Sequence, residues 1–178
     1  KDLPGRSTKS FATSADDIGN LPLEVCETIN GSWGFNLKDR KHKSKKNLVQ
    51  YLIKAAGYDS NLLLNVGPMP NGKIQKEHIK SLKEIGDWVK INGETIYGTS
   101  RGPIDPTDEI ASTQKDNTIY IHLLDNRKTY FIEGYNPKIK KISYYHSNKK
   151  VKYQKTKSGL IINVCLLYTS DAADDLWC

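Results

Sequence analysis

The chain has 178 residues, of which 37% are hydrophobic and 26% are charged, a composition that fits a packed globular protein and excludes a disordered or fibrous one. Its length fits one domain or two small ones and excludes a large enzyme complete in itself. Its longest apolar runs are far shorter than the roughly 18 residues of a membrane span, so we expect no membrane partner.

Positive charge is unevenly spread along the chain. Lysine and arginine number 27 against 20 acidic residues, for a net charge of +7, and residues 134–157 hold eight lysines and no acid. Such a run could bind an anionic partner. Lysines solvated on exposed strand faces are the more common explanation, so we expect no nucleic acid partner. The three cysteines lack metal-type spacing and cannot all pair, so neither a metal site nor a disulfide framework is expected.

The two ends look abnormal. The chain starts at Lys1 without an initiator methionine or a signal peptide, so we expect the natural start to be missing. Residues 165–178 resemble a translated sequencing adapter, and we expect them to be a non-native tail.

The first half alternates strands and helices. Residues 1–20 read as a loop, and residues 21–29 as a short buried strand ending at the turn formers Asn30 and Gly31. Apolar spacing from Ser44 predicts a helix that ends at a left-handed Gly57. Residues 61–66 form an apolar run typical of a buried parallel strand, and spacings of three and four over residues 79–89 predict a second helix. This order predicts a parallel α/β sheet or barrel with helices outside.

The second half loses helical periodicity. Residues 98–108 are rich in turn formers, and short β-rich runs follow at 118–123, 129–132, 141–145, 150–153 and 159–164. We therefore expect an antiparallel β domain, as one layer or part of a sandwich, and a domain boundary near residue 105. Two strand–helix pairs cannot close a barrel, and five strands are few for a sandwich, so both domains are expected to be incomplete.

One carboxylate in the first strand needs an explanation. Glu24 follows Leu23 in an apolar run, and burying a bare charge is costly. Strand alternation places Glu24 and Cys26 on one face and Glu27 on the other. From this pattern alone, a hydrogen bond to a loop N–H is the commoner role, while the rim of an active site is the alternative. Cys26 is expected to be a small packed core residue.

Several blocks of the chain are informative together, and they are residues 23–30, 32–36, 61–68, 71–72, 85–88 and 92–99. In order and spacing these blocks resemble the α-L-fucosidases of glycoside hydrolase family 29. The resemblance covers about residues 1–105 and, more loosely, the β domain after them.

The resemblance implies a fold and an activity. The fold is α/β, a partial (β/α)8-like barrel made of its last strand–helix units over residues 1–105, followed by an incomplete antiparallel β-sandwich over residues 106–164. The activity is retaining, exo-acting hydrolysis of terminal α-L-fucose from glycoconjugates or oligosaccharides, without a cofactor. By the same resemblance, a bacterial parent would be periplasmic or secreted.

Residue roles also follow from the resemblance. Glu24 resembles the general acid/base, while the Asp nucleophile belongs to earlier barrel strands, so we expect the chain to be inactive alone. Trp33 either stacks on the sugar or plugs the barrel end. Arg6 could approach the substrate from its loop, although an exposed arginine is the commoner case. Asn65 could line the pocket floor, beside a turn at Gly67. The alternative function is a carbohydrate- or polyanion-binding β module built on the tyrosine-rich second half, whose tyrosines are Tyr120, Tyr130, Tyr135, Tyr144, Tyr145 and Tyr153.

Overall fold

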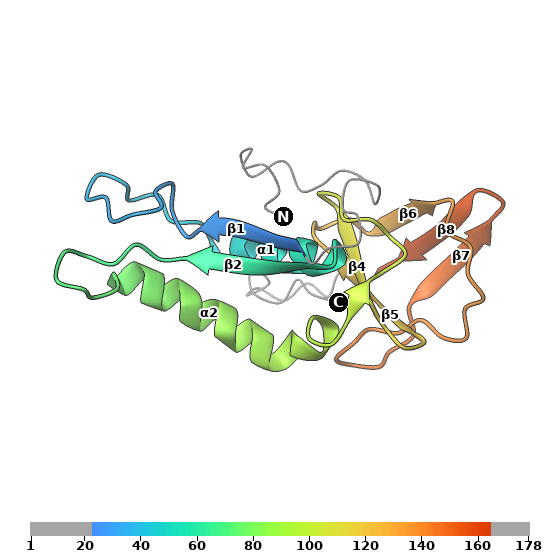
Figure 1. Ribbon diagram of the computed structural model, residues 1–178. Helices are drawn as coiled ribbons and strands as arrows, with labels where there is room; N and C mark the ends of the chain where they lie inside the picture. The colour runs from blue at the N-terminus through green and yellow to red at the C-terminus, as the bar shows by residue number, and fades with distance from the viewer. Residues whose placement is uncertain (1–22, 165–178) are drawn as a thin grey trace.

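A computed structural model of the chain describes residues 23–164, which form a mixed α/β unit followed by a unit of antiparallel strands (Figure 1). Arg6 and residues 165–178 lie outside the described residues. The first unit contains β1 (Leu23–Thr28), α1 (Lys45–Gly57), β2 (Ser60–Asn65) and α2 (Lys76–Asn92), followed by the short 3-10 helix η2 (Gly93–Thr95). The strand–helix–strand–helix order predicted from the sequence is therefore confirmed.

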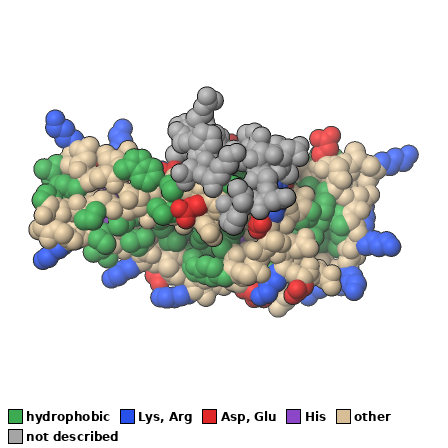
Figure 2. All heavy atoms as spheres, in the orientation of Figure 1, with side chains coloured by type: hydrophobic (Ala, Val, Ile, Leu, Met, Phe, Trp, Pro, Cys, Tyr) green, Lys and Arg blue, Asp and Glu red, His purple; other side chains and the backbone are tan. Residues whose placement is uncertain are grey.

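β1 and β2 pair in parallel, as the sequence predicts. Their register places Glu24 beside Asn61, Cys26 beside Leu63 and Thr28 beside Asn65. Val25 and Glu27 lie on the other face and are more buried, because α1 packs there through its contacts with β2. The face that carries Glu24, Cys26 and Leu63 is open in the described chain, and the Leu63 side chain is 44% exposed. Figure 2 shows other apolar side chains gathered on the surface of this unit.

α1 starts after Ser44 and ends at Gly57, as predicted, but Gly57 does not have the expected left-handed conformation. Ser44 caps the first turn, and its hydroxyl accepts a hydrogen bond of 3.2 Å from the Asn47 amide. The left-handed residue is instead Asp59, two residues further on, with φ of 58°. Gly57 is buried inside the last turn, where an added Cβ would lie 2.7 Å from the Pro106 ring, so the glycine allows the second unit to pack closely.

The second unit consists of two three-stranded antiparallel sheets. One contains β3 (Ser100–Arg101), β4 (Ile110–Lys115) and β5 (Thr118–Leu123), in that order. The other has the order β6 (Thr129–Glu133), β8 (Gly159–Asn163), β7 (Lys152–Thr156). The strands predicted near 118, 129, 150 and 159 are confirmed, with bounds shifted by up to three residues.

Two differences from the prediction have physical reasons. β4 was not predicted because its sequence, Ile-Ala-Ser-Thr-Gln-Lys, has little of the β-branched and aromatic character that marks a strand. Its small residues instead fit a strand whose first four residues are all buried. The run at 141–145 forms only one isolated bridge, between Ser143 and Lys150, because the chain turns back there and Asn148 donates to the Tyr144 carbonyl.

The two units share apolar packing. One buried cluster lies within the β unit and includes Tyr130, Leu160 and Ile162. A second cluster joins α1 and α2 to the β unit, and its members are Val49, Ile53, Trp88, Ile96, Ala111 and Leu124. Within residues 23–164, the structure contains no helix long and apolar enough to cross a membrane.

Candidate active site

Glu24 is an exposed carboxylate on the open face of β1. It makes no ion pair with the described residues, and its Oε1 lies 4.0 Å from the Cys26 sulfur on the same face. Cys26 is itself exposed, so the expectation that it is a packed core residue is wrong. Strand alternation puts Cys26 on the face opposite to Val25 and Glu27, and within residues 23–164 it is the face of Val25 and Glu27 that α1 covers.

The carboxyl ends of the two strands are joined by loop contacts. Asn65, the last residue of β2, donates a hydrogen bond of 2.7 Å to the backbone carbonyl of Trp33. The Trp33 side chain is 59% exposed, so its ring is open to solvent beside this junction. The structure therefore brings together two of the four residues singled out from the sequence, Trp33 and Asn65.

Gly67 has a packing role at the same place. A Cβ added there would lie 2.6 to 2.9 Å from the backbone of Gly34 and Phe35. The loops that follow β1 and β2 can approach this closely only because residue 67 has no side chain. The sequence suggested a turn role for Gly67, and the structure adds this close approach.

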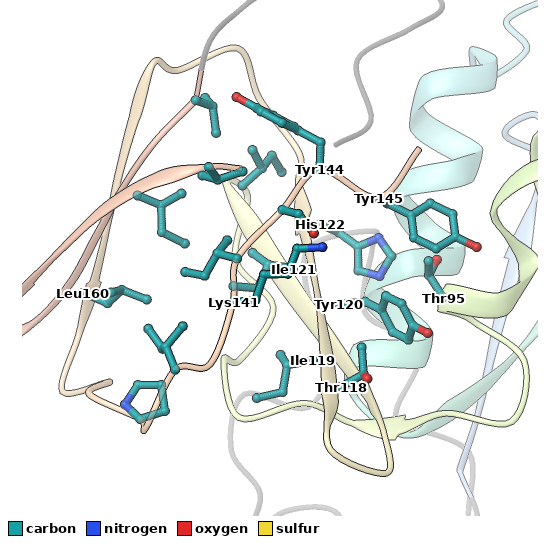
Figure 3. Close-up of a pocket in the computed structure, with 18 of the residues that line it drawn as sticks. Thr95, Thr118, Ile119, Tyr120, Ile121, His122, Lys141, Tyr144, Tyr145 and Leu160 are labelled. Atoms are coloured by element: carbon teal, nitrogen blue, oxygen red, sulfur yellow. The ribbon is translucent and has the colours of Figure 1, made fainter. Parts of the chain in front are cut away.

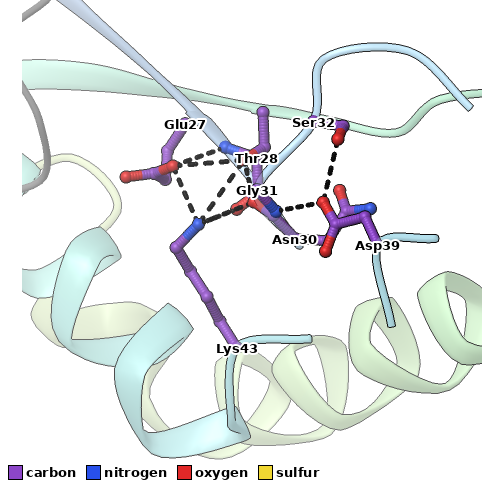
Figure 4. A network of polar contacts seen from close by, with 7 residues as sticks. All are labelled: Glu27, Thr28, Asn30, Gly31, Ser32, Asp39 and Lys43. Carbon is purple, nitrogen blue, oxygen red and sulfur yellow. Dashed lines mark hydrogen bonds and ion pairs between the residues drawn. The ribbon is translucent and has the colours of Figure 1, made fainter. Parts of the chain in front are cut away.

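A polar network fixes the end of β1 on the opposite face (Figure 4). The Lys43 ammonium lies 3.1 Å from Oε1 of Glu27 and donates to the carbonyl oxygens of Thr28 and Asn30 at 2.7 and 3.0 Å. The Thr28 amide donates to the same Glu27 oxygen at 2.7 Å. Both side chains of the pair are mostly buried. Only one feature of this network is predictable from the sequence, the strand alternation that turns Glu27 away from Glu24.

Asp39 holds the start of the following loop. Its Oδ2 accepts hydrogen bonds from the Gly31 amide at 2.8 Å and from the Ser32 hydroxyl at 2.9 Å. The hydrogen bond from Ser32 is the main cause that lowers the pKa of Asp39, with a smaller contribution from the Gly31 amide. The loop that carries Trp33 is therefore tied down at three points, by Asp39, Lys43 and Asn65.

Residues 23–164 contain no group of three or more His, Cys, Asp or Glu side chains that could hold a metal ion. Glu24 and Asn65 share a face of the sheet, but Glu24 is the second residue of β1 and pairs with Asn61, four residues before Asn65. At roughly 3.3 Å per residue the two lie about 13 Å apart along the strands. The structure does not bring Glu24 into contact with Trp33 or Asn65.

Comparison with known proteins gives a consistent result. The family model for α-L-fucosidase matches residues 6–94. The chain is 34% identical to an α-L-fucosidase of Dictyostelium discoideum over 97 residues, which are 51% of this chain and 21% of that protein. It is 35% identical to human plasma α-L-fucosidase over 79 residues, or 43% of this chain and 17% of the human protein.

Solved structures share the mixed α/β fold. α-L-Fucosidase isoenzyme 1 from Paenibacillus thiaminolyticus superposes with a TM-score of 0.72 at 30% identity, over 85% of this chain and 38% of that one. Thermotoga maritima α-fucosidase in complex with fucose gives a TM-score of 0.74 at 27% identity, over 85% and 37%.

The match to the family model covers half of the chain. The chain belongs to the α-L-fucosidase family of glycoside hydrolases, and it spans about a fifth of the length of the curated relatives it matches.

Proposed function

We propose that the chain is part of a retaining, exo-acting α-L-fucosidase that releases terminal α-L-fucose from glycoconjugates or oligosaccharides. Residues 1–105 are the last strand–helix units of a (β/α)8-like catalytic barrel, residues 106–164 begin a β-sandwich, and residues 165–178 are a non-native tail. The parallel pair of β1 and β2 backed by α1, and the change to antiparallel strands after residue 98, support this division. Fucose in the Thermotoga complex supports the substrate class.

Glu24 is the proposed general acid/base. The supporting observation is its exposure on the face of β1 that α1 leaves open, the face that points into the interior of a closed barrel. Glu27 is the nearest alternative carboxylate, but it lies on the covered face and is paired with Lys43. Because catalytic groups usually gather at the carboxyl ends of barrel strands, a role for Glu24 requires a sugar pocket that reaches down the barrel axis.

The proposed mechanism needs a second carboxylate. In the first step, Glu24 protonates the glycosidic oxygen as its bond to the anomeric carbon breaks and the nucleophile bonds to that carbon. In the second step, Glu24 takes a proton from the water that displaces the nucleophile. We assign the nucleophile to an aspartate in the part of the enzyme that this chain does not include, about 5 to 5.5 Å from Glu24. The chain alone is therefore inactive.

Three other residues have proposed roles at the sugar. Trp33 stacks its exposed ring on the apolar face of fucose, and Asn65 holds the Trp33 backbone while lining the floor of the pocket. Arg6 approaches the substrate from the preceding loop. No cofactor or metal takes part in this scheme.

The proposal is tested with the chain and with a hybrid enzyme. The purified chain should give no turnover of an aryl α-L-fucoside. A hybrid in which residues 6–94 replace the matching segment of the Paenibacillus enzyme should hydrolyse it, and Glu24→Gln should reduce kcat by about 100-fold or more, while Glu27→Gln should change kcat much less. Turnover by the chain alone, or an equal loss in both variants, would contradict the proposal.

A further inference from the structure

The β unit contains a cavity well separated in sequence from Glu24. Its volume is about 640 Å³, within the usual range for ligand pockets. Its inner wall is apolar and includes Leu123, Leu160 and Ile162. The segment 137–145 and β5 also line the cavity, and they contribute polar side chains such as Lys141, Tyr120 and Tyr145 at what we call its rim (Figure 3).

Aromatic side chains are concentrated around this cavity. Of the six tyrosines noted in the second half of the sequence, four line it, and all four are partly exposed: Tyr120, Tyr135, Tyr144 and Tyr145. The rings of Tyr120 and Tyr145 meet edge to face, with centroids 5.9 Å apart. Their hydroxyls donate to the two oxygens of Glu94, at 3.2 and 3.0 Å, which fixes the orientation of both rings. Partly exposed, immobilised tyrosine rings suit the apolar face of a sugar.

Lysines lie on the same rim. Lys138, Lys140 and Lys141 all line the cavity and are all exposed. No ion pair within residues 23–164 involves any of the three. Glu94 is the carboxylate that contacts the lining tyrosines, and both of its oxygens accept their hydroxyls. The rim therefore presents ammonium groups that are available to an anion.

The basic surface continues along the edge of the neighbouring sheet. The segment 136–142 lies beside β7 and the residue before it, and three hydrogen bonds hold it there. Asn136 donates to the Thr156 carbonyl, and Lys155 donates to the Pro137 carbonyl. The Val151 amide donates to the Ile142 carbonyl. The remaining lysines of the acid-free run lie on β7 or close to its ends, and all are exposed: Lys149, Lys150, Lys152, Lys155 and Lys157. This excess of positive charge near the rim attracts a polyanion.

We propose that this cavity and its lysine rim form a second glycan site, which binds an anionic polysaccharide carrying sulfate or carboxylate groups. A sugar ring packs on the tyrosines while its anionic substituents pair with Lys138, Lys140 and Lys141. The choice of a polysaccharide over another polyanion rests on the proposed function, since a fucosidase acts on glycan chains. The site needs no part of the Glu24 machinery, so binding can be measured without catalysis.

The test measures binding by the 178-residue chain. Dextran sulfate is the probe, uncharged dextran is the neutral control, and a single-stranded DNA oligonucleotide is the competing polyanion. The test variant is Lys138→Gln/Lys140→Gln/Lys141→Gln. Its matched control, Lys76→Gln/Lys80→Gln/Lys83→Gln, removes three exposed charges from α2 and changes the net charge equally.

We expect dextran sulfate to bind, with affinity that falls steeply between about 50 and 200 mM salt. The rim variant should lose about tenfold or more in affinity and the α2 variant less than about twofold. The assignment would be overturned if dextran sulfate did not bind or if both variants lost affinity equally. It would also be overturned if uncharged dextran bound equally well or if the DNA bound more tightly. Because none of these outcomes depends on hydrolysis, a failure here is distinguishable from a failure of the proposed fucosidase function.

Discussion

The side chain of Asn65 donates a hydrogen bond of 2.7 Å to the backbone carbonyl of Trp33, a residue 32 positions earlier in the chain. This bond joins the last residue of β2 to the loop that follows β1. It places an exposed tryptophan ring at the carboxyl end of the parallel pair, where barrel enzymes bind substrate. The position of Trp33 therefore depends on a neighbouring strand as well as on its own loop.

Removing this bond should loosen the loop. We expect Asn65→Ala to lower the free energy of unfolding by about 1 kcal/mol and to speed tryptic cleavage at Lys38, Arg40 or Lys41 severalfold. Asn61→Ala, on the same face of β2 and exposed, is the control and should change neither quantity. Equal cleavage rates in the two variants would show that Asn65 does not hold the loop.

Two glycines should respond to alanine with opposite signs. Gly67→Ala places a Cβ within 2.9 Å of the backbone of Gly34 and Phe35, and we expect a loss of about 1 to 3 kcal/mol in the free energy of unfolding. Gly86→Ala, inside α2 with nothing within 4 Å of the new Cβ, should gain up to about 1 kcal/mol. Chemical denaturation of both variants measures the difference, and a neutral Gly67→Ala would refute the close approach of the loops.

The pair of Lys43 and Glu27 should stabilise the end of β1. Lys43→Met leaves the carbonyls of Thr28 and Asn30 without this donor and the Glu27 carboxylate without its counter-charge, so we expect a loss of about 2 kcal/mol. The control is Lys90→Met, which removes an ammonium that is 79% exposed and paired with Asp87, and it should cost less than about 0.5 kcal/mol. Similar losses in the free energy of unfolding in both variants would mean that the buried pair of Lys43 and Glu27 stabilises the protein no more than the exposed pair does.

The β unit should lose stability in acid through His122. Burial lowers the pKa of His122 to about 4 from the ordinary 6.5, with a small opposing effect from Thr95. The unfolded chain therefore binds a proton on this histidine at a higher pH than the folded chain does. Because of His122, the free energy of unfolding should fall by about 3 kcal/mol in total as the pH falls from about 6.5 toward 4. Above about pH 6.5 this loss is absent.

Denaturation at several pH values tests this contribution. His122→Gln should flatten the decline in the free energy of unfolding between pH 6.5 and 4. Burial also lowers the pKa of His78, so the free energy of unfolding of the His122 variant should still fall somewhat in acid. An unchanged slope in His122→Gln would contradict the prediction.

Periodicity and caps predicted most of the fold, because β1, α1, β2 and α2 carry strong local patterns. β4 was missed because its small polar residues become a strand only through tertiary pairing with β5. The exposure of Cys26 was missed because the sequence of a single strand does not show which of its two faces another element covers. The contact of Lys43 with Glu27 joins residues 16 positions apart across an irregular loop, which no spacing rule describes. The blocks near Glu24 and Trp33 were informative because their order and spacing match a known family.

In the proposed function, Glu24 transfers the proton in a retaining fucosidase. The most direct measurement is azide rescue of Glu24→Gln in the hybrid that carries residues 6–94, using an aryl fucoside with a good leaving group. If Glu24 is the acid/base, azide should restore turnover and the product should be α-L-fucosyl azide, because azide attacks the fucosyl-enzyme without needing a general base. Full activity of Glu24→Gln without azide would contradict that role. So would a variant that azide does not rescue and that also releases no initial burst of the aryl group.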